Sequence, residues 1–350
     1  MRTAHDAAVA LARRYSFGDV TALVTGGLVR PPETWAARLP PLCVFGQRLM
    51  DLDAEDFGVP EHDDAGRPAV PRGLIARSRS CRMPQTPREQ PRGALATLRP
   101  AFRLLLEVID ARWRRREMAA LVAVIHIAAE YLPLLAWETV LGHAGDPALL
   151  EESAGGPGSR FGDQEDRACT HRRNDASAAN RALRVAGEPP SGWQAYLDRQ
   201  HSNMAHGLAT CAAECREPCT VITRMDDGVR ADLARRCEFA LAMQGSALVR
   251  LRHAAPVGHG FGVPSPEEVL DAWDRTRESL AARGIACLDQ PGGDAFPLPG
   301  LSRVFSEIAG CTLTPDTLLA DTAAVIVDCL EGRGAPEADP VREPVTAEEH

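Results

Sequence analysis

The sequence contains no lysine: all 39 of its basic residues are arginines. This absence excludes mechanisms that need a lysine side chain, such as a P-loop phosphate site, a pyridoxal Schiff base or a lysine nucleophile. Aromatic residues make up only 5% of the chain. Few aromatic faces are therefore available to stabilise a positive charge.

Positive charge is also scarce overall. The formal net charge is -9, so the electrostatic field of the whole chain repels phosphate backbones and anionic lipid. We therefore expect no nucleic-acid partner. The first residues, MRTAHDAAVALARRYS, lack an apolar signal core with a cleavage site. We expect a cytoplasmic protein whose ten cysteines are free thiols.

Apolar residues make up 45% of the 350 residues, which is enough for a sizeable helical core. From Ala94 to His143 they recur at three- and four-residue spacing, a pattern typical of core helices. The most apolar stretch, 118–137, is long enough to span a bilayer, but it contains His126, Glu130 and Pro133. We predict a buried core helix here and no membrane insertion.

Proline and glycine mark the breaks between helices. The segment 59–93 is dense in Pro, Gly and Arg, and it predicts a long surface loop with one short helix at 74–80. Ser265, followed by Pro266 and two glutamates, predicts the N-cap of a helix that continues to about Arg283. We predict a main helical domain over 1–257, additional C-terminal helices over 258–330, and a disordered acidic tail over 331–350.

The first candidate site is an acidic segment that follows the apolar residues Leu42 to Phe45. It contains Asp51, Asp53 and Asp56. On a helix, Asp53 and Asp56 would point the same way, a geometry in which two carboxylates can bridge Mg²⁺ to phosphate oxygens. The alternative is an ordinary solvated helix end.

The second candidate site is HRRNDAS, residues 171–177. Asn174 and Asp175 could supply oxygen ligands to Mg²⁺, while Arg172 or Arg173 binds a diphosphate through two hydrogen bonds. The alternative is a charged helix face.

Taken together, these two clusters resemble the class I terpene synthases, whose helical barrels present an aspartate-rich motif and an Asn/Asp-Asp motif on opposing helices. The stretch VFGQRLMDLDAEDF looks like the helix that carries the first motif, and the order and separation of the clusters agree with the family. Members usually carry Ser or Thr four residues after the asparagine and an acid four further on. Here those positions are Ala178 and Ala182, and Ser177 lies one residue early.

The resemblance implies an all-α fold, a class I terpenoid-synthase-like helical barrel or bundle with extra C-terminal helices. It implies a lyase of terpenoid biosynthesis in secondary metabolism. The reaction would be Mg²⁺-dependent ionisation and cyclisation of a prenyl diphosphate of fifteen or twenty carbons, linear or bicyclic, with release of diphosphate. A homodimer is among the expected assemblies.

The resemblance also assigns roles to residues. Asp53 and Asp175 would be catalytic. The metal ligands would be Asp51, Asp53, Asp56, Asn174, Asp175 and Ser177. The diphosphate ligands would be Arg172, Arg173, Arg250 and Arg252.

Three other interpretations stay open. A helical-bundle non-haem iron oxidase could use His126, Glu130, Glu138, His143, His201 and His206. The ladder Cys211, Cys215 and Cys219 could bind zinc, although the spacing favours one buried helix stripe. The chain could also be a non-catalytic helical interaction protein.

Overall fold

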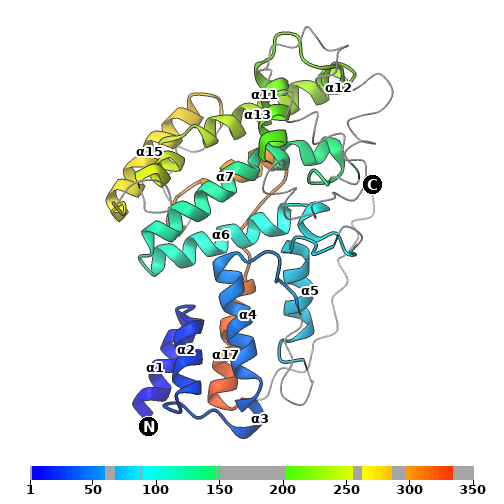
Figure 1. Cartoon of the computed structure of the whole chain (residues 1–350). Helices are drawn as coiled ribbons and strands as arrows, with labels where there is room; N and C mark the ends of the chain where they lie inside the picture. Colours follow the sequence, from blue (N-terminus) through cyan, green and yellow to red (C-terminus); the bar gives the residue numbers. More distant parts are fainter. Residues whose placement is uncertain are drawn as a thin grey trace, which may run out of the picture. The chain divides into compact units, whose positions relative to one another are not determined.

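A computed structural model describes residues 2–59, 68–86, 89–146, 149, 202–254, 262–285 and 296–333. Every regular element among these residues is a helix, which confirms the predicted all-α class. The chain forms two compact units: residues 1–82 with 317–350, and residues 83–316. Figure 1 shows the helices of both units and labels most of them.

The first unit joins the two ends of the chain. Its helices are α1 (Arg2–Arg13), α2 (Phe17–Thr25), α3 (Glu33–Ala36), α4 (Leu39–Asp51), α5 (Arg72–Cys81) and α17 (Leu318–Glu331). α17 packs against α1, α4 and α5 and buries the apolar side chains of Leu319, Ile326 and Leu330. The first unit thus combines segments from both ends of the chain, and the domain ranges predicted from the sequence stay predictions.

Close packing holds α2 against α4. A Cβ atom at Gly46 would lie 2.8 Å from the Phe17 ring, so only glycine permits this approach. α5 matches the short helix predicted at 74–80. It is tied to α17 because Arg77 donates to the carboxylate of Asp321 at 2.5 Å and to Thr317 Oγ1 at 3.0 Å.

The second unit is built around one long helix. Its helices are η1 (Gly93–Leu95), α6 (Arg99–Arg114), α7 (Met118–Leu141), α11 (Ser202–Glu214), α12 (Thr220–Thr223), α13 (Asp227–Gln244), α14 (Ala247–Arg250), η4 (Leu251–Ala254), α15 (Pro266–Ala281) and α16 (Leu301–Ala309). α7 packs against α6, α11, α13 and α16. It holds the central place predicted for a core helix.

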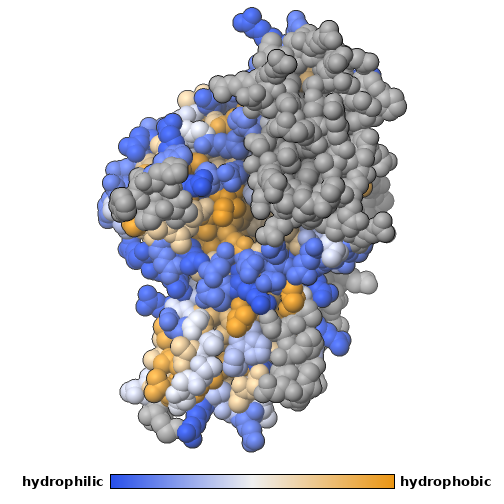
Figure 2. Space-filling model, in the orientation of Figure 1, coloured by the Kyte–Doolittle hydropathy of each residue, from blue (hydrophilic) through white to orange (hydrophobic). Residues whose placement is uncertain are grey.

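The apolar composition of α7 serves this packing. Its length and hydropathy would also fit a membrane span, but 61% of that window is buried inside the protein. Trp137 and Leu132 are completely buried, while Ile127 is 40% exposed. Figure 2 shows that apolar residues reach the surface of this unit in an area bordered by hydrophilic ones.

Two features fix the helices of this unit at their ends. Glu138 of α7 accepts the backbone N–H of Leu98 at 2.9 Å and the hydroxyl of Thr97 at 2.5 Å, which anchors the start of α6. α15 begins with a complete capping box, since Ser265 accepts the amide of Glu268 and Glu268 accepts that of Ser265. This cap is the one predicted from the sequence.

Candidate functional site

The acidic segment predicted to bind metal continues beyond the end of its helix. α4 ends at Asp51, and the next residue, Leu52, has a positive φ of 55°. The amide of Asp53 closes the helix by donating to the carbonyl of Arg48 at 3.0 Å. Because Asp53 and Asp56 follow this reversal in turns, the expectation that they share one helix face is wrong.

Neighbouring side chains contact two of the acids in this segment. Gln47 donates to the carboxylate of Asp51 at 2.7 Å, and Arg48 Nε lies 3.8 Å from Asp56 Oδ2. Partial burial and the carboxylates of Asp56 and Asp51 raise the pKa of Asp53, against the opposing effect of Arg48. Within the described ranges, no group of three or more His, Cys, Asp or Glu side chains is placed to hold a metal ion. The roles of Asp51, Asp53 and Asp56 as Mg²⁺ ligands therefore stay predictions.

The second predicted cluster lies outside the described residues. Its roles in metal and diphosphate binding therefore stay predictions for Arg172, Arg173, Asn174, Asp175 and Ser177. The acidic segment belongs to the first unit, and the remaining predicted diphosphate ligands, Arg250 and Arg252, belong to the second.

Arg250 and Arg252 have different surroundings. The Arg252 guanidinium contacts Nε2 of His126 on α7, and the same nitrogen lies 2.9 Å from Glu130 Oε1. Burial and Arg252 lower the pKa of His126, whereas Glu130 raises it. Arg252 is thus engaged with α7, while Arg250 lines a pocket.

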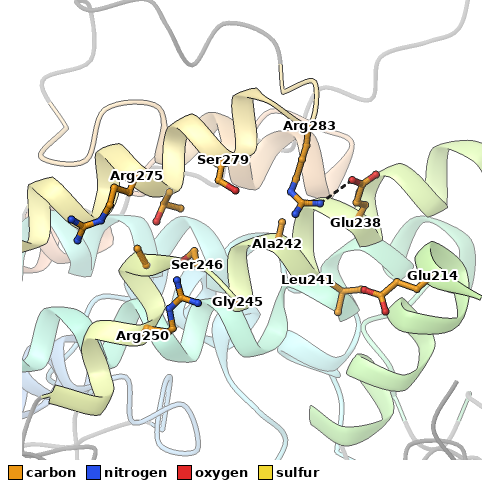
Figure 3. Close-up of a pocket in the computed structure, with 12 residues that line it drawn as sticks. Glu214, Glu238, Leu241, Ala242, Gly245, Ser246, Arg250, Arg275, Ser279 and Arg283 are labelled. Carbon is orange, nitrogen blue, oxygen red and sulfur yellow. Dashed lines mark hydrogen bonds and ion pairs between the residues drawn. The ribbon is translucent and has the colours of Figure 1, made fainter.

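The pocket has a volume of about 410 Å³, and Figure 3 shows it in close-up. Its lining comes from four helices: the end of α11, the last turns of α13, the short helix α14, and α15. This volume is within the range of cavities that hold small organic ligands. The lining residues are Glu214, Glu238, Leu241, Ala242, Gly245, Ser246, Ala247, Arg250, Arg275, Thr276, Ser279 and Arg283.

Hydrogen bonds position Arg250 at this pocket. Ser246 caps α14 by accepting the amide of Val249 at 3.3 Å. Thr276 of α15 accepts the amide of Leu248 at 3.1 Å. Because this bond joins α14 to α15, the base of the Arg250 side chain is fixed relative to both helices.

The charged side chains of the pocket are unevenly distributed. Figure 3 shows Arg250 and Arg275 toward one end and Glu214 and Glu238 toward the other. Arg283 donates to Glu238 at 3.2 Å, so these two charges offset each other. Across the part of the chain that the structure describes, no ion pair joins Arg250 or Arg275 to an acidic side chain.

Of these five charged residues, the sequence indicated only Arg250. The others carry no motif, because Glu214, Glu238 and Arg275 come from three separate helices, α11, α13 and α15, and Arg283 follows the end of α15. No local signal could have identified them.

The residues of the iron-site alternative have separate structural surroundings. Glu138 anchors the start of α6, and His143 accepts the amide of Asp146 at 2.9 Å. His206 Nδ1 lies 3.3 Å from the side-chain oxygen of Gln244, and His201 lies outside the described residues.

The three cysteines predicted to form a ladder do not share one helix. Cys211 and Cys219 are completely buried, and the amide of Cys219 donates to the Cys211 sulfur at 3.3 Å. Cys215 follows the end of α11. Cys219 also lies beyond that helix end and Cys215 is only partly buried, so the prediction of one buried helix stripe is wrong.

No protein-family model, curated protein or solved structure matches this chain. The geometry of the pocket is therefore the basis for a functional proposal.

Proposed function

We propose that this protein binds a small phosphate or diphosphate ester in the pocket lined by Arg250 and Arg275. The observation that carries the proposal is a pair of guanidiniums at one end of a cavity, without an acidic partner among the described residues. A guanidinium offers several N–H donors in one plane and matches the oxygens of a phosphate. The chain as a whole carries a net charge of -9, so this end of the pocket has the opposite sign to the whole protein.

The rest of the pocket suits the organic part of such an ester. Leu241 and Ala242 of α13 supply apolar surface, and Ser279 of α15 supplies a hydroxyl. Both arginines are exposed, so their side chains can turn toward a common phosphate. A mixed lining of this kind, apolar with a few polar groups, is typical of small-molecule sites.

The test is calorimetric titration with hexyl phosphate. We expect saturable binding by the native protein and about tenfold weaker binding by Arg250→Gln and by Arg275→Gln, a loss of about 1.4 kcal/mol each. Arg230→Gln is the matched control, because Arg230 lies on α13 and does not line the pocket. Equal affinity in all four proteins would contradict the proposal.

A second candidate is the prenyl diphosphate chemistry implied by the resemblance to class I terpene synthases, together with their helical barrel. The observation that favours it is that Arg250, assigned to the diphosphate by that resemblance, lines the pocket. A prenyl diphosphate is also a member of the proposed ligand class. For Mg²⁺ binding, this candidate rests on the sequence prediction at Asn174, Asp175 and Ser177.

Product analysis tests this candidate. The protein is incubated with Mg²⁺ and a panel of linear and bicyclic prenyl diphosphates, and the mixture is extracted for hydrocarbons and alcohols. We expect a product that is lost in both Asp53→Ala and Arg250→Gln. If no substrate yields a product or releases diphosphate, this candidate is wrong, and the calorimetric result alone decides the binding proposal.

A further inference from the structure

The two ends of the pocket carry opposite charge. Arg250 and Arg275 give one end two positive charges. At the other end, Glu238 is paired with Arg283, and among the described residues no basic side chain is paired with Glu214. The pocket therefore resembles a dipole, positive at one end and negative at the other.

The ends are far enough apart to act as separate subsites. Glu238 lies seven residues before Gly245, the C-cap of α13, which corresponds to about 10 Å along the helix axis. This separation is comparable to the distance over which physiological salt screens charges, about 8 Å. A compact anion held by the arginines would leave the acidic end without a partner.

Building on the proposed phosphate site, we propose that its ligand is zwitterionic, with a phosphate ester at one end and an amine at the other end of a short carbon chain. A phosphate monoester carries about two negative charges at neutral pH, which matches the two guanidiniums. The ammonium group matches the carboxylate of Glu214. The apolar side chains of Leu241 and Ala242 line the same cavity and suit the connecting chain.

Arg283 sets the strength of the amine subsite. Its guanidinium donates to Glu238 and so competes with a ligand ammonium for that carboxylate. Removing Arg283 should expose a second negative charge, and removing the Glu238 charge should leave Arg283 as a third positive one. The two substitutions are therefore expected to change ligand preference in opposite directions.

The test compares hexyl phosphate with aminohexyl phosphate, which differ only in the terminal amine. We expect the native protein to prefer aminohexyl phosphate about three- to fivefold, as an exposed ion pair allows. Glu214→Gln should abolish the preference. Arg283→Gln should increase it, and Glu238→Gln, which leaves the Glu214 charge opposed by Arg283, should reduce it. Glu217→Gln is the control, since Glu217 follows α11 and does not line the pocket.

The outcomes separate this inference from the proposed function. If both ligands bind equally to the native protein, and the arginine variants weaken both, the zwitterion is wrong and the phosphate site stands. If neither ligand binds, both proposals are wrong. An unchanged preference in Glu214→Gln also overturns the inference. Far-ultraviolet circular dichroism of each variant shows that lost binding does not reflect lost folding.

Discussion

Arg92 and Asp146 form a buried ion pair in the second unit through two parallel bonds. Arg92 Nε and Nη2 each lie 2.7 Å from a carboxylate oxygen of Asp146, whose side chain is 2% exposed. Removing one charge from such a pair leaves the other buried without its partner. This pair is therefore expected to matter more for stability than any exposed ion pair of the chain.

Asp146→Asn should lower the free energy of unfolding by about 3 kcal/mol, as measured by urea denaturation. The control is Asp227→Asn, because Asp227 is paired with Arg230 at 2.8 Å but its side chain is 92% exposed. The control should cost less than about 1 kcal/mol. Equal costs for the two substitutions would contradict this assignment.

His143 should make stability depend on pH. The residue is 3% exposed, and its Nδ1 accepts the amide of Asp146. Burial lowers the pKa of His143 below its ordinary value of 6.5, although Asp146 opposes this effect. Below the ordinary value, the unfolded chain therefore binds more protons than the folded one, and stability falls as the pH falls.

The variant His143→Asn keeps a hydrogen-bond acceptor at this position and removes the titrating group. Between about pH 7.5 and about pH 5.5, we expect the native protein to lose more unfolding free energy than the variant, by no more than about 1.4 kcal/mol per pH unit. Urea denaturation at both pH values measures the difference. Parallel losses in the two proteins would show that His143 is not responsible.

At the scale of helices, capping residues and apolar spacing predicted helix positions correctly, whereas the spacing of charged residues did not predict a shared helix face correctly. The spacing from Ala94 to His143 correctly predicted core helices, and the Ser265 cap correctly predicted the start of α15. The helix end at Asp51 was missed because a left-handed residue at Leu52 has no sequence signal. Without that end, the spacing of Asp53 and Asp56 suggested a shared helix face that does not exist.

Short helices are also hard to predict from the sequence. α16 has only nine residues, so its buried Leu301, Val304, Phe305 and Ile308 fill barely two turns. A pattern this brief does not distinguish a helix from a loop that packs on the core. A tertiary contact stabilises α16 instead. The ring of Phe305 packs edge to face against the ring of Phe102, with the two ring centroids 5.3 Å apart.

The capping box of α15 gives a prediction at this scale. Ser265→Ala should lower the midpoint of urea unfolding by an amount equivalent to about 1 kcal/mol, because the amide of Glu268 loses its acceptor. Ser265→Asp should restore most of this loss, since its carboxylate can accept the same bond. If Ser265→Asp is as destabilised as Ser265→Ala, the cap is not the cause.

At the scale of the whole molecule, the two units each have a core of their own. The sequence could not indicate that α17 completes the first unit, because long-range contacts between the chain ends leave no local pattern. It likewise could not indicate the pocket, whose charged residues come from four helices and the turn after α15.

Hydrogen exchange tests this division. Ile326 of α17 is completely buried, so Ile326→Ala should cost about 2–4 kcal/mol and speed amide exchange mainly in α1, α4 and α17. Leu132→Ala in α7 is the reciprocal control and should act mainly on α6, α11 and α13. Uniform acceleration throughout the chain by either substitution would contradict two separate cores.

The most direct test of phosphate binding by Arg250 and Arg275 is a crystal structure with bromohexyl phosphate, whose bromine locates the ligand by anomalous scattering. We predict the phosphate between the two guanidiniums and the bromine toward Glu214, within the pocket of the second unit. A ligand located elsewhere, or no ligand in the pocket at a concentration that saturates binding in solution, would contradict the claim.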